Sequence, residues 1–175
     1  MDLFINSVKF LSRIAGIASA ALVGAAIIVV CQMVFMRYAL NASTIWQTEF
    51  VIFSLVGATL IGSPYVLLVK GHVNVDLLPL YFGARGRFIL ALLASFGGLT
   101  FCGLLAWTGW ELFYEALING WRTETVWSLP LWIPYLALPL GIGLLSLQYV
   151  ADILALLTGR EMPFAKRDEA GEDRI

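Results

Sequence analysis

Four long apolar runs constrain this 175-residue chain more than any other feature of its sequence. They cover about residues 14–36, 46–69, 88–110 and 131–157. Each can cross the ~30 Å hydrocarbon layer of a bilayer, which needs about 20 helical residues. Backbone groups in lipid must find partners within their own segment, and no run alternates like a barrel strand. We therefore expect an all-α integral membrane protein with four transmembrane helices.

Composition agrees with a chain that faces lipid. Its residues are 60% hydrophobic and only 13% charged, whereas soluble domains are about 25% charged. The net charge of −1 indicates no nucleic-acid partner. The first run follows two basic residues, as in a signal peptide, but it is long enough to be a retained helix. We expect residues 1–158 to form one transmembrane domain and the charged residues 159–175 to form a disordered tail.

The basic residues indicate how the chain is oriented. Two of the eleven, Arg37 and Arg122, lie in the first and third loops. The other nine lie in the amino-terminal segment, the central loop and the tail: Lys9, Arg13, Lys70, Arg85, Arg87, Arg160, Lys166, Arg167 and Arg174. By the positive-inside rule, both termini and the central loop face the cytoplasm. Five of the six tryptophans lie at the opposite face, as in an interfacial aromatic belt: Trp107, Trp110, Trp121, Trp127 and Trp132.

The central loop begins with a polar stretch, Lys70-Gly71-His72-Val73-Asn74-Val75-Asp76. Lys70, His72 and Asp76 fit either a charge-paired turn that anchors the two hairpins at the inner face or an ordinary solvated loop. The apolar residues 75–82, followed by a basic Arg-Gly-Arg sequence, also fit an interfacial helix between spans two and three.

Arg37 and Glu49 lie on either side of the short first loop. Thr44 and Gln47 have the spacing of a capping box at the start of the second helix. Arg37 and Glu49 fit either an outward-facing contact point or a structural ion pair between the two helices. In the third loop, Arg122 and its neighbouring carboxylates fit either a surface for a soluble partner or ordinary solvated charges. Pro134 and Pro139 lie in the fourth run, where they should bend the helix.

The chain has no arrangement typical of an enzyme or a metal site. His72 is the only histidine, so one chain cannot build a bis-histidine haem site. Cys31 and Cys102 lie within apolar runs, away from any loop. The charged residues of spans two and four, Glu49 and Asp152, lie near the helix ends, whereas ion transport usually needs such groups near the midplane. We expect no catalysis and no cofactor in this chain.

Taken together, these residues resemble the small membrane subunit of tripartite ATP-independent periplasmic (TRAP) transporters. The resemblance covers nearly the whole chain up to residue 159. It rests on the order and spacing of several motifs: Arg37-Tyr38 with Asn41, Trp46 and Glu49; residues 70–76; Trp127-Ser128-Leu129-Pro130; and Trp132, Pro134-Tyr135 and Pro139-Leu140-Gly141. Leu129 differs from the family pattern, which often has threonine or another small polar residue there.

The resemblance implies a noncatalytic scaffold subunit in a bacterial inner membrane. Its implied partners are membrane lipid, a large multi-span subunit that carries the substrate and sodium sites, and a periplasmic binding protein that delivers an organic acid for sodium-coupled symport. Two alternatives remain open on the residues alone: a self-sufficient small four-helix transporter, and a membrane anchor of a redox complex.

Overall fold

The computed structural model of the chain describes residues 2–69 and 84–157, and it contains four long helices. They are α1 (Asp2–Ala39), α2 (Ile45–Leu68), α4 (Ala84–Ile118) and α5 (Trp132–Leu157). Each contains a segment long and apolar enough to cross a membrane: Ile5–Ala39, Ile45–Leu68, Leu92–Ile118 and Trp132–Leu154. The predicted all-α class with four spanning helices is confirmed.

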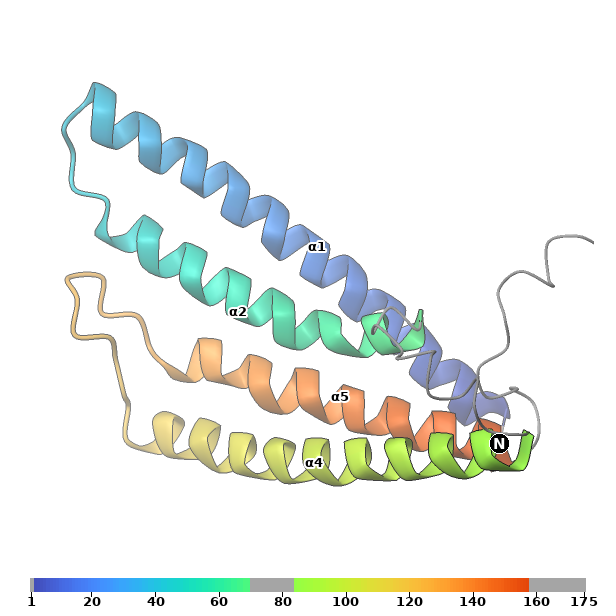
Figure 1. The fold of residues 1–175 in the computed structure, drawn as a ribbon. Coiled ribbons are helices and arrows are strands. Elements are labelled where there is room, and N and C mark those ends of the chain that lie inside the picture. The colour runs from blue at the N-terminus through green and yellow to red at the C-terminus, as the bar shows by residue number, and fades with distance from the viewer. Residues whose placement is uncertain (1, 70–83, 158–175) are drawn as a thin grey trace, which may run out of the picture.

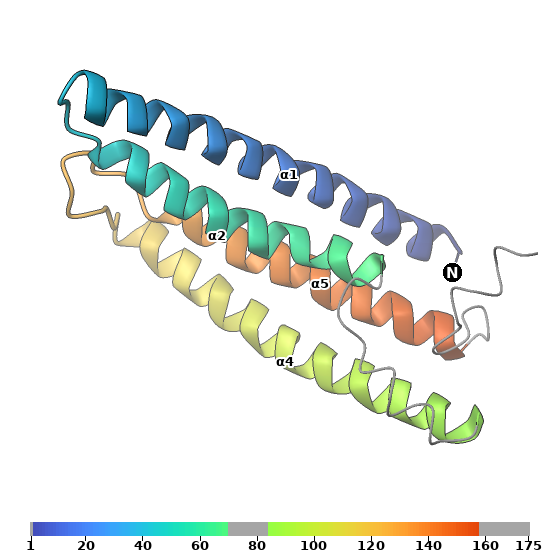
Figure 2. The ribbon, with the colours of Figure 1, turned by 45° about the horizontal axis from the view of Figure 1, so that its top comes forward.

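The helices form two antiparallel hairpins that lie side by side (Figure 1). α1 packs along α2, α2 along α5 and α5 along α4, with a shorter contact between α1 and α5. Among the described helices, α4 contacts only α5, so the four helices form an open array with α1 and α4 at its edges (Figures 1 and 2). The short loops 40–44 and 119–131 lie at one end, which we call the tryptophan end. α1 begins and α5 ends at the other, the terminal end.

Two helices are considerably longer than the apolar runs that predicted them. α1 begins at Asp2 and includes Lys9 and Arg13, while α4 runs from Ala84 to Ile118. Charged residues do not interrupt a helix, because its hydrogen bonds are internal and long side chains can reach water. The Arg-Gly-Arg sequence therefore belongs to α4 itself. The polar stretch 70–76 and most of the predicted interfacial helix lie outside the described residues.

Small residues allow the helices to approach closely. A Cβ atom at Gly62 would lie 2.6 Å from Ser19 Oγ, and that hydroxyl donates a 2.7 Å hydrogen bond to the Ala58 carbonyl. Gly16 leaves room for the Tyr65 ring, and Gly98 leaves room for Tyr149. Helices inside lipid have no hydrophobic driving force for association. Small residues favour association because they let the helices approach closely enough for extensive van der Waals contact.

The backbones of α2 and α5 approach closely near Pro64. This proline is buried inside α2, and because it lacks an N–H it leaves the Leu60 carbonyl without its helical donor. The Ser63 hydroxyl donates to that carbonyl at 2.8 Å. Gly141 of α5 lies directly against the same carbonyl, where a Cβ atom would collide with backbone. The Leu60 carbonyl is therefore a shared contact of α2 and α5, with Ser63 on one side and Gly141 on the other.

The predicted bend at Pro134 is wrong. α5 begins at Trp132, so this proline lies in the first turn of the helix. The first N–H groups of a helix have no partner within the helix, and a proline there breaks no hydrogen bond. Pro139 is the proline inside α5.

Candidate functional site

The loop 119–131 is ordered by its own hydrogen bonds. Thr123 N–H donates to Leu129 O at 3.0 Å, and Leu131 N–H donates to Trp121 O at 2.9 Å. The Thr123 hydroxyl accepts a further 3.0 Å bond from Leu129 N–H. Gly120 has a φ of 61°, which lets the chain leave α4 without a Cβ clash. These bonds form a tight loop whose tip, Val126, is 89% exposed.

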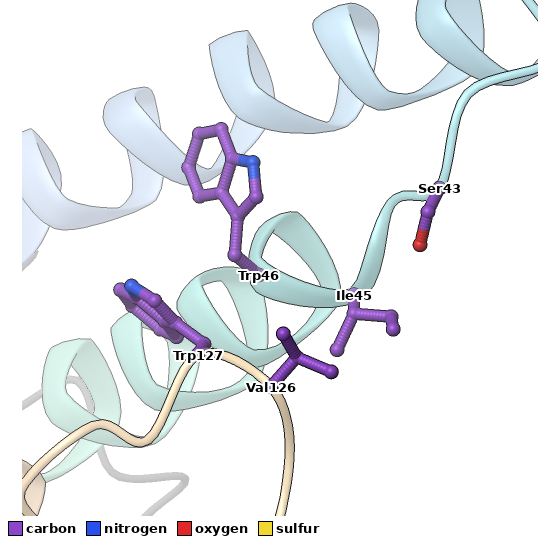
Figure 3. Close-up of a pocket in the computed structure, with 5 residues that line it drawn as sticks. All are labelled: Ser43, Ile45, Trp46, Val126 and Trp127. Carbon is purple, nitrogen blue, oxygen red and sulfur yellow. The ribbon is translucent and has the colours of Figure 1, made fainter.

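Trp46 and Trp127 connect the first turn of α2 to the loop 119–131. Their ring centroids lie 6.3 Å apart with the planes tilted by 58°, a favoured geometry for aromatic pairs. Beside them is a pocket of ≈ 330 Å³ (Figure 3). The residues that line it come from both loops and the first turn of α2: Ser43, Ile45, Trp46, Val126 and Trp127. Trp46 thus joins the predicted tryptophan cluster, which sequence reasoning had assigned to the third loop and the helix ends beside it.

Arg37, near the end of α1, forms a hydrogen bond with the last residue of the first loop. Its guanidinium donates a 2.9 Å hydrogen bond to Thr44 Oγ1. Thr44 is the N-cap residue of α2, but its side chain makes no capping bond. The predicted capping box is therefore wrong, because Arg37 takes the acceptor that a cap would have used. The structure forms no ion pair between Arg37 and Glu49.

Two polar atoms near the start of α2 are buried without a hydrogen-bond partner among the described residues. They are Gln47 Oε1 and Glu49 Oε2. Gln47, the second residue of the predicted capping box, is only 1% exposed. Glu49 lies two residues further along α2. Unpaired buried polar groups are uncommon, because each loses its hydrogen bonds to water and gains none in return.

The other predicted site residues take simpler positions. Arg122 is exposed in the loop and forms an isolated antiparallel bridge with Pro130. Trp127 packs on Trp46, and Pro134 lies in the first turn of α5. Lys70, His72 and Asp76 lie outside the described residues. The structure brings Trp127 next to the turn before Glu49, but it does not bring Arg37 onto that carboxylate.

Sequence reasoning missed a polar contact toward the terminal end. Ser12 Oγ donates to Gln148 Oε1 at 3.0 Å, and Gln148 Nε2 donates to Asp152 Oδ1 at the same distance. Ser12 and Gln148 are both 0% exposed. A glutamine inside an apolar run was the available signal, since such a side chain must find a polar partner in the membrane.

No group of three His, Cys, Asp or Glu side chains lies together within residues 2–69 and 84–157. The tryptophan end presents a pocket lined by Trp46 and Trp127, which suits recognition of another molecule.

Comparisons with known proteins identify the family. The family model described as the DctQ component of tripartite ATP-independent periplasmic transporters matches residues 26–159. A C4-dicarboxylate TRAP transporter small permease protein from Vibrio cholerae is 28% identical over 186 residues, which cover 94% of this chain and 80% of that protein. A protein of the same name from Rhodobacter capsulatus is 27% identical over 119 residues, covering 68% of this chain and 52% of that protein.

No solved structure matches the chain. The family match nevertheless covers most of it, including the tryptophan end and all of α2 and α5. With its four membrane helices, the chain is a multi-pass bacterial membrane protein and belongs to the DctQ family, the small permease component of TRAP transporters.

Proposed function

We propose that this chain is a noncatalytic scaffold subunit of a sodium-coupled TRAP transporter that imports an organic acid. A large multi-span membrane subunit would carry the substrate and sodium sites, and a periplasmic binding protein would deliver the substrate. The names of both relatives, which refer to C4-dicarboxylates, support an organic acid as the substrate class.

The scaffold role is supported by the hydrogen bonds of polar side chains in the described helices, because their partners lie within the chain. Several hydroxyls within the spans donate to carbonyls of their own helix: Thr59 to Leu55, Thr100 to Phe96, Thr108 to Leu104 and Ser146 to Ile142. The Ser19 hydroxyl donates to the Ala58 carbonyl of the neighbouring helix. Ser12 and Gln148 bind each other. Charged side chains lie toward the helix ends. A solute path needs polar groups directed at the solute, so the described spans are better suited to support than to transport.

The open array also favours a role within a larger assembly. α1 and α4 lie at its edges, and large apolar side chains are exposed along both, including Ile17, Ile28, Leu93 and Phe101. Exposed apolar surface of this kind is stable only against lipid or another membrane protein. One edge can therefore receive the large subunit while the other faces lipid.

Reconstitution tests the proposal directly. We expect liposomes that contain this chain alone to show no sodium-dependent uptake of a C4-dicarboxylate. Liposomes that contain it together with the large subunit and the binding protein should accumulate the substrate. Omitting this chain should remove uptake. Uptake by this chain alone would instead support the self-sufficient small transporter.

The orientation has its own test. We propose that the tryptophan end faces the periplasm and both termini face the cytoplasm in the bacterial inner membrane, as the distribution of basic residues supports. In a background with Cys31→Ser and Cys102→Ala, a Val126→Cys variant should react with a membrane-impermeant maleimide in intact spheroplasts. Protection until the spheroplasts are lysed would reverse the assigned orientation.

A further inference from the structure

Glu49 follows the two α2 residues that line the pocket of the tryptophan end by about one helical turn. Residues three and four apart on a helix are neighbours, so Glu49 shares a face with Ile45 and Trp46, the two α2 residues that line the pocket. Helical side chains lean toward the amino-terminal end of their helix. The Glu49 side chain therefore leans toward the turn that forms one wall of the pocket.

The carboxylate of Glu49 has no counter-charge among the described residues. One of its oxygens is buried without a hydrogen-bond partner. Arg37, the nearest basic residue along the chain, donates to Thr44 instead, and Arg122 lies exposed in the other loop. A carboxylate partly removed from water and left unpaired is costly, and ionisable groups in membrane segments usually pair with another group.

The pocket walls suit a cation with a long apolar stem. Trp46 and Trp127 offer aromatic faces, which attract guanidinium and ammonium groups. Ile45 and Val126 offer apolar contacts. Arginine combines all three requirements, because it stacks on aromatic rings, buries its methylenes and binds carboxylates through two N–H groups.

We propose that this pocket receives an arginine side chain of the large membrane subunit, whose guanidinium pairs with Glu49. The large subunit is the favoured source because Glu49 lies about one turn inside the membrane helix α2, at a depth that suits a neighbouring membrane helix better than a soluble protein. This inference rests on the proposed function, since it requires the two membrane subunits to form a complex.

Co-purification through a tag on the large subunit tests the proposal. We expect Glu49→Gln to reduce the retained small subunit by about tenfold or more, Glu49→Lys to abolish retention, and Glu49→Asp to restore part of it. Glu111→Gln is the matched control, because Glu111 lies toward the same end but is exposed and accepts a bond from Trp107. It should leave retention unchanged. Equal amounts of each variant in the membrane before solubilisation exclude a folding defect.

The partner arginine can be identified by a double-mutant cycle. Each arginine near the periplasmic ends of the large subunit's helices is changed to alanine. One change should reproduce the Glu49→Gln loss and add nothing to it. Normal retention of Glu49→Gln, or losses that are additive for every arginine, would overturn the inference.

The remaining outcomes distinguish a failure of the arginine proposal from a failure of the proposed function. If the wild-type chain fails to co-purify with the large subunit, the proposed function itself fails. If Glu49→Gln releases only the binding protein while the membrane subunits stay together, the pocket belongs to the binding protein. If it releases only bound phosphatidylethanolamine, the pocket binds a lipid ammonium group. Either result would contradict the arginine proposal.

Discussion

Ser12 and Gln148 are 136 residues apart in the sequence, yet the serine hydroxyl donates a 3.0 Å hydrogen bond to the glutamine amide oxygen where both side chains are fully buried. The bond links α1 directly to α5, across the two hairpins. It is continued along α5, because the Gln148 amide donates to Asp152. This contact fixes how the first helix lies on the last.

Ser12→Ala should therefore lower the stability of the isolated chain. It leaves the Gln148 oxygen buried without its donor, and we expect a loss of about 1 kcal/mol, near the value typical of interhelical bonds in membranes. Thermal unfolding in detergent or steric trapping in bicelles measures this. Ser146→Ala is the control, since its hydroxyl only donates to Ile142 of its own helix. A loss from the control as large as that from Ser12→Ala would contradict a special role for the bond.

Two glycines of α5 should respond in opposite ways to alanine. Gly141→Ala places a methyl group against the Leu60 carbonyl. It should lower the free energy of unfolding by about 1–3 kcal/mol, because the clash is with backbone and α2 and α5 must shift apart to relieve it. A methyl group at Gly143 would meet no atom of another helix within 4 Å. Gly143→Ala should be neutral or stabilising by up to about 1 kcal/mol, since alanine favours helix. Equal effects in unfolding measurements would refute the close approach of α2 and α5.

Trp46 and Trp127 should be energetically coupled. The tilted ring pair predicts a coupling of about 0.5–1.5 kcal/mol beyond the burial of each ring. A double-mutant cycle with Trp46→Leu and Trp127→Leu in unfolding measurements gives that value. The same cycle with Trp132→Leu in place of Trp127→Leu is the control. Coupling that is no larger in the first cycle would show that these rings do not hold the loop 119–131 to α2.

Glu49→Gln should not destabilise the isolated chain. The carboxylate has no ion-pair partner among the described residues, so its neutralisation should leave the free energy of unfolding unchanged or raise it by up to about 1 kcal/mol. The proposed loss of complex with the same variant would then come from a missing contact between chains. A loss above about 1 kcal/mol in the isolated chain would indicate a stabilising pair within it.

Arg37 and Thr44 should act as one unit. Arg37→Gln and Thr44→Val each remove the 2.9 Å bond of the first loop, and each should cost about 1 kcal/mol. The double variant should cost no more than the larger single loss. Additive losses would show that the two side chains act independently and would reopen the pairing of Arg37 with Glu49.

The composition and the lengths of the apolar runs determined the fold class. Runs of spanning length with little charge can fold only as helices in lipid, so four membrane helices and the tight first hairpin followed from the sequence alone. The residues from Arg37 to Glu49 and from Trp127 to Gly141 also indicated the family, because their order and spacing can be read without coordinates.

Tertiary structure decided which side chains meet. Sequence spacing assigned Thr44 and Gln47 to a cap, but the helix crossing placed Arg37 on Thr44 and buried Gln47. It also brought Trp46 onto Trp127, placed Gly141 against a carbonyl freed by Pro64, and joined Ser12 to Gln148. Helix formation depends on local hydrogen bonds and hydropathy, whereas these contacts depend on how two helices rotate and approach. That relation between helices far apart in the chain cannot be read from either helix alone.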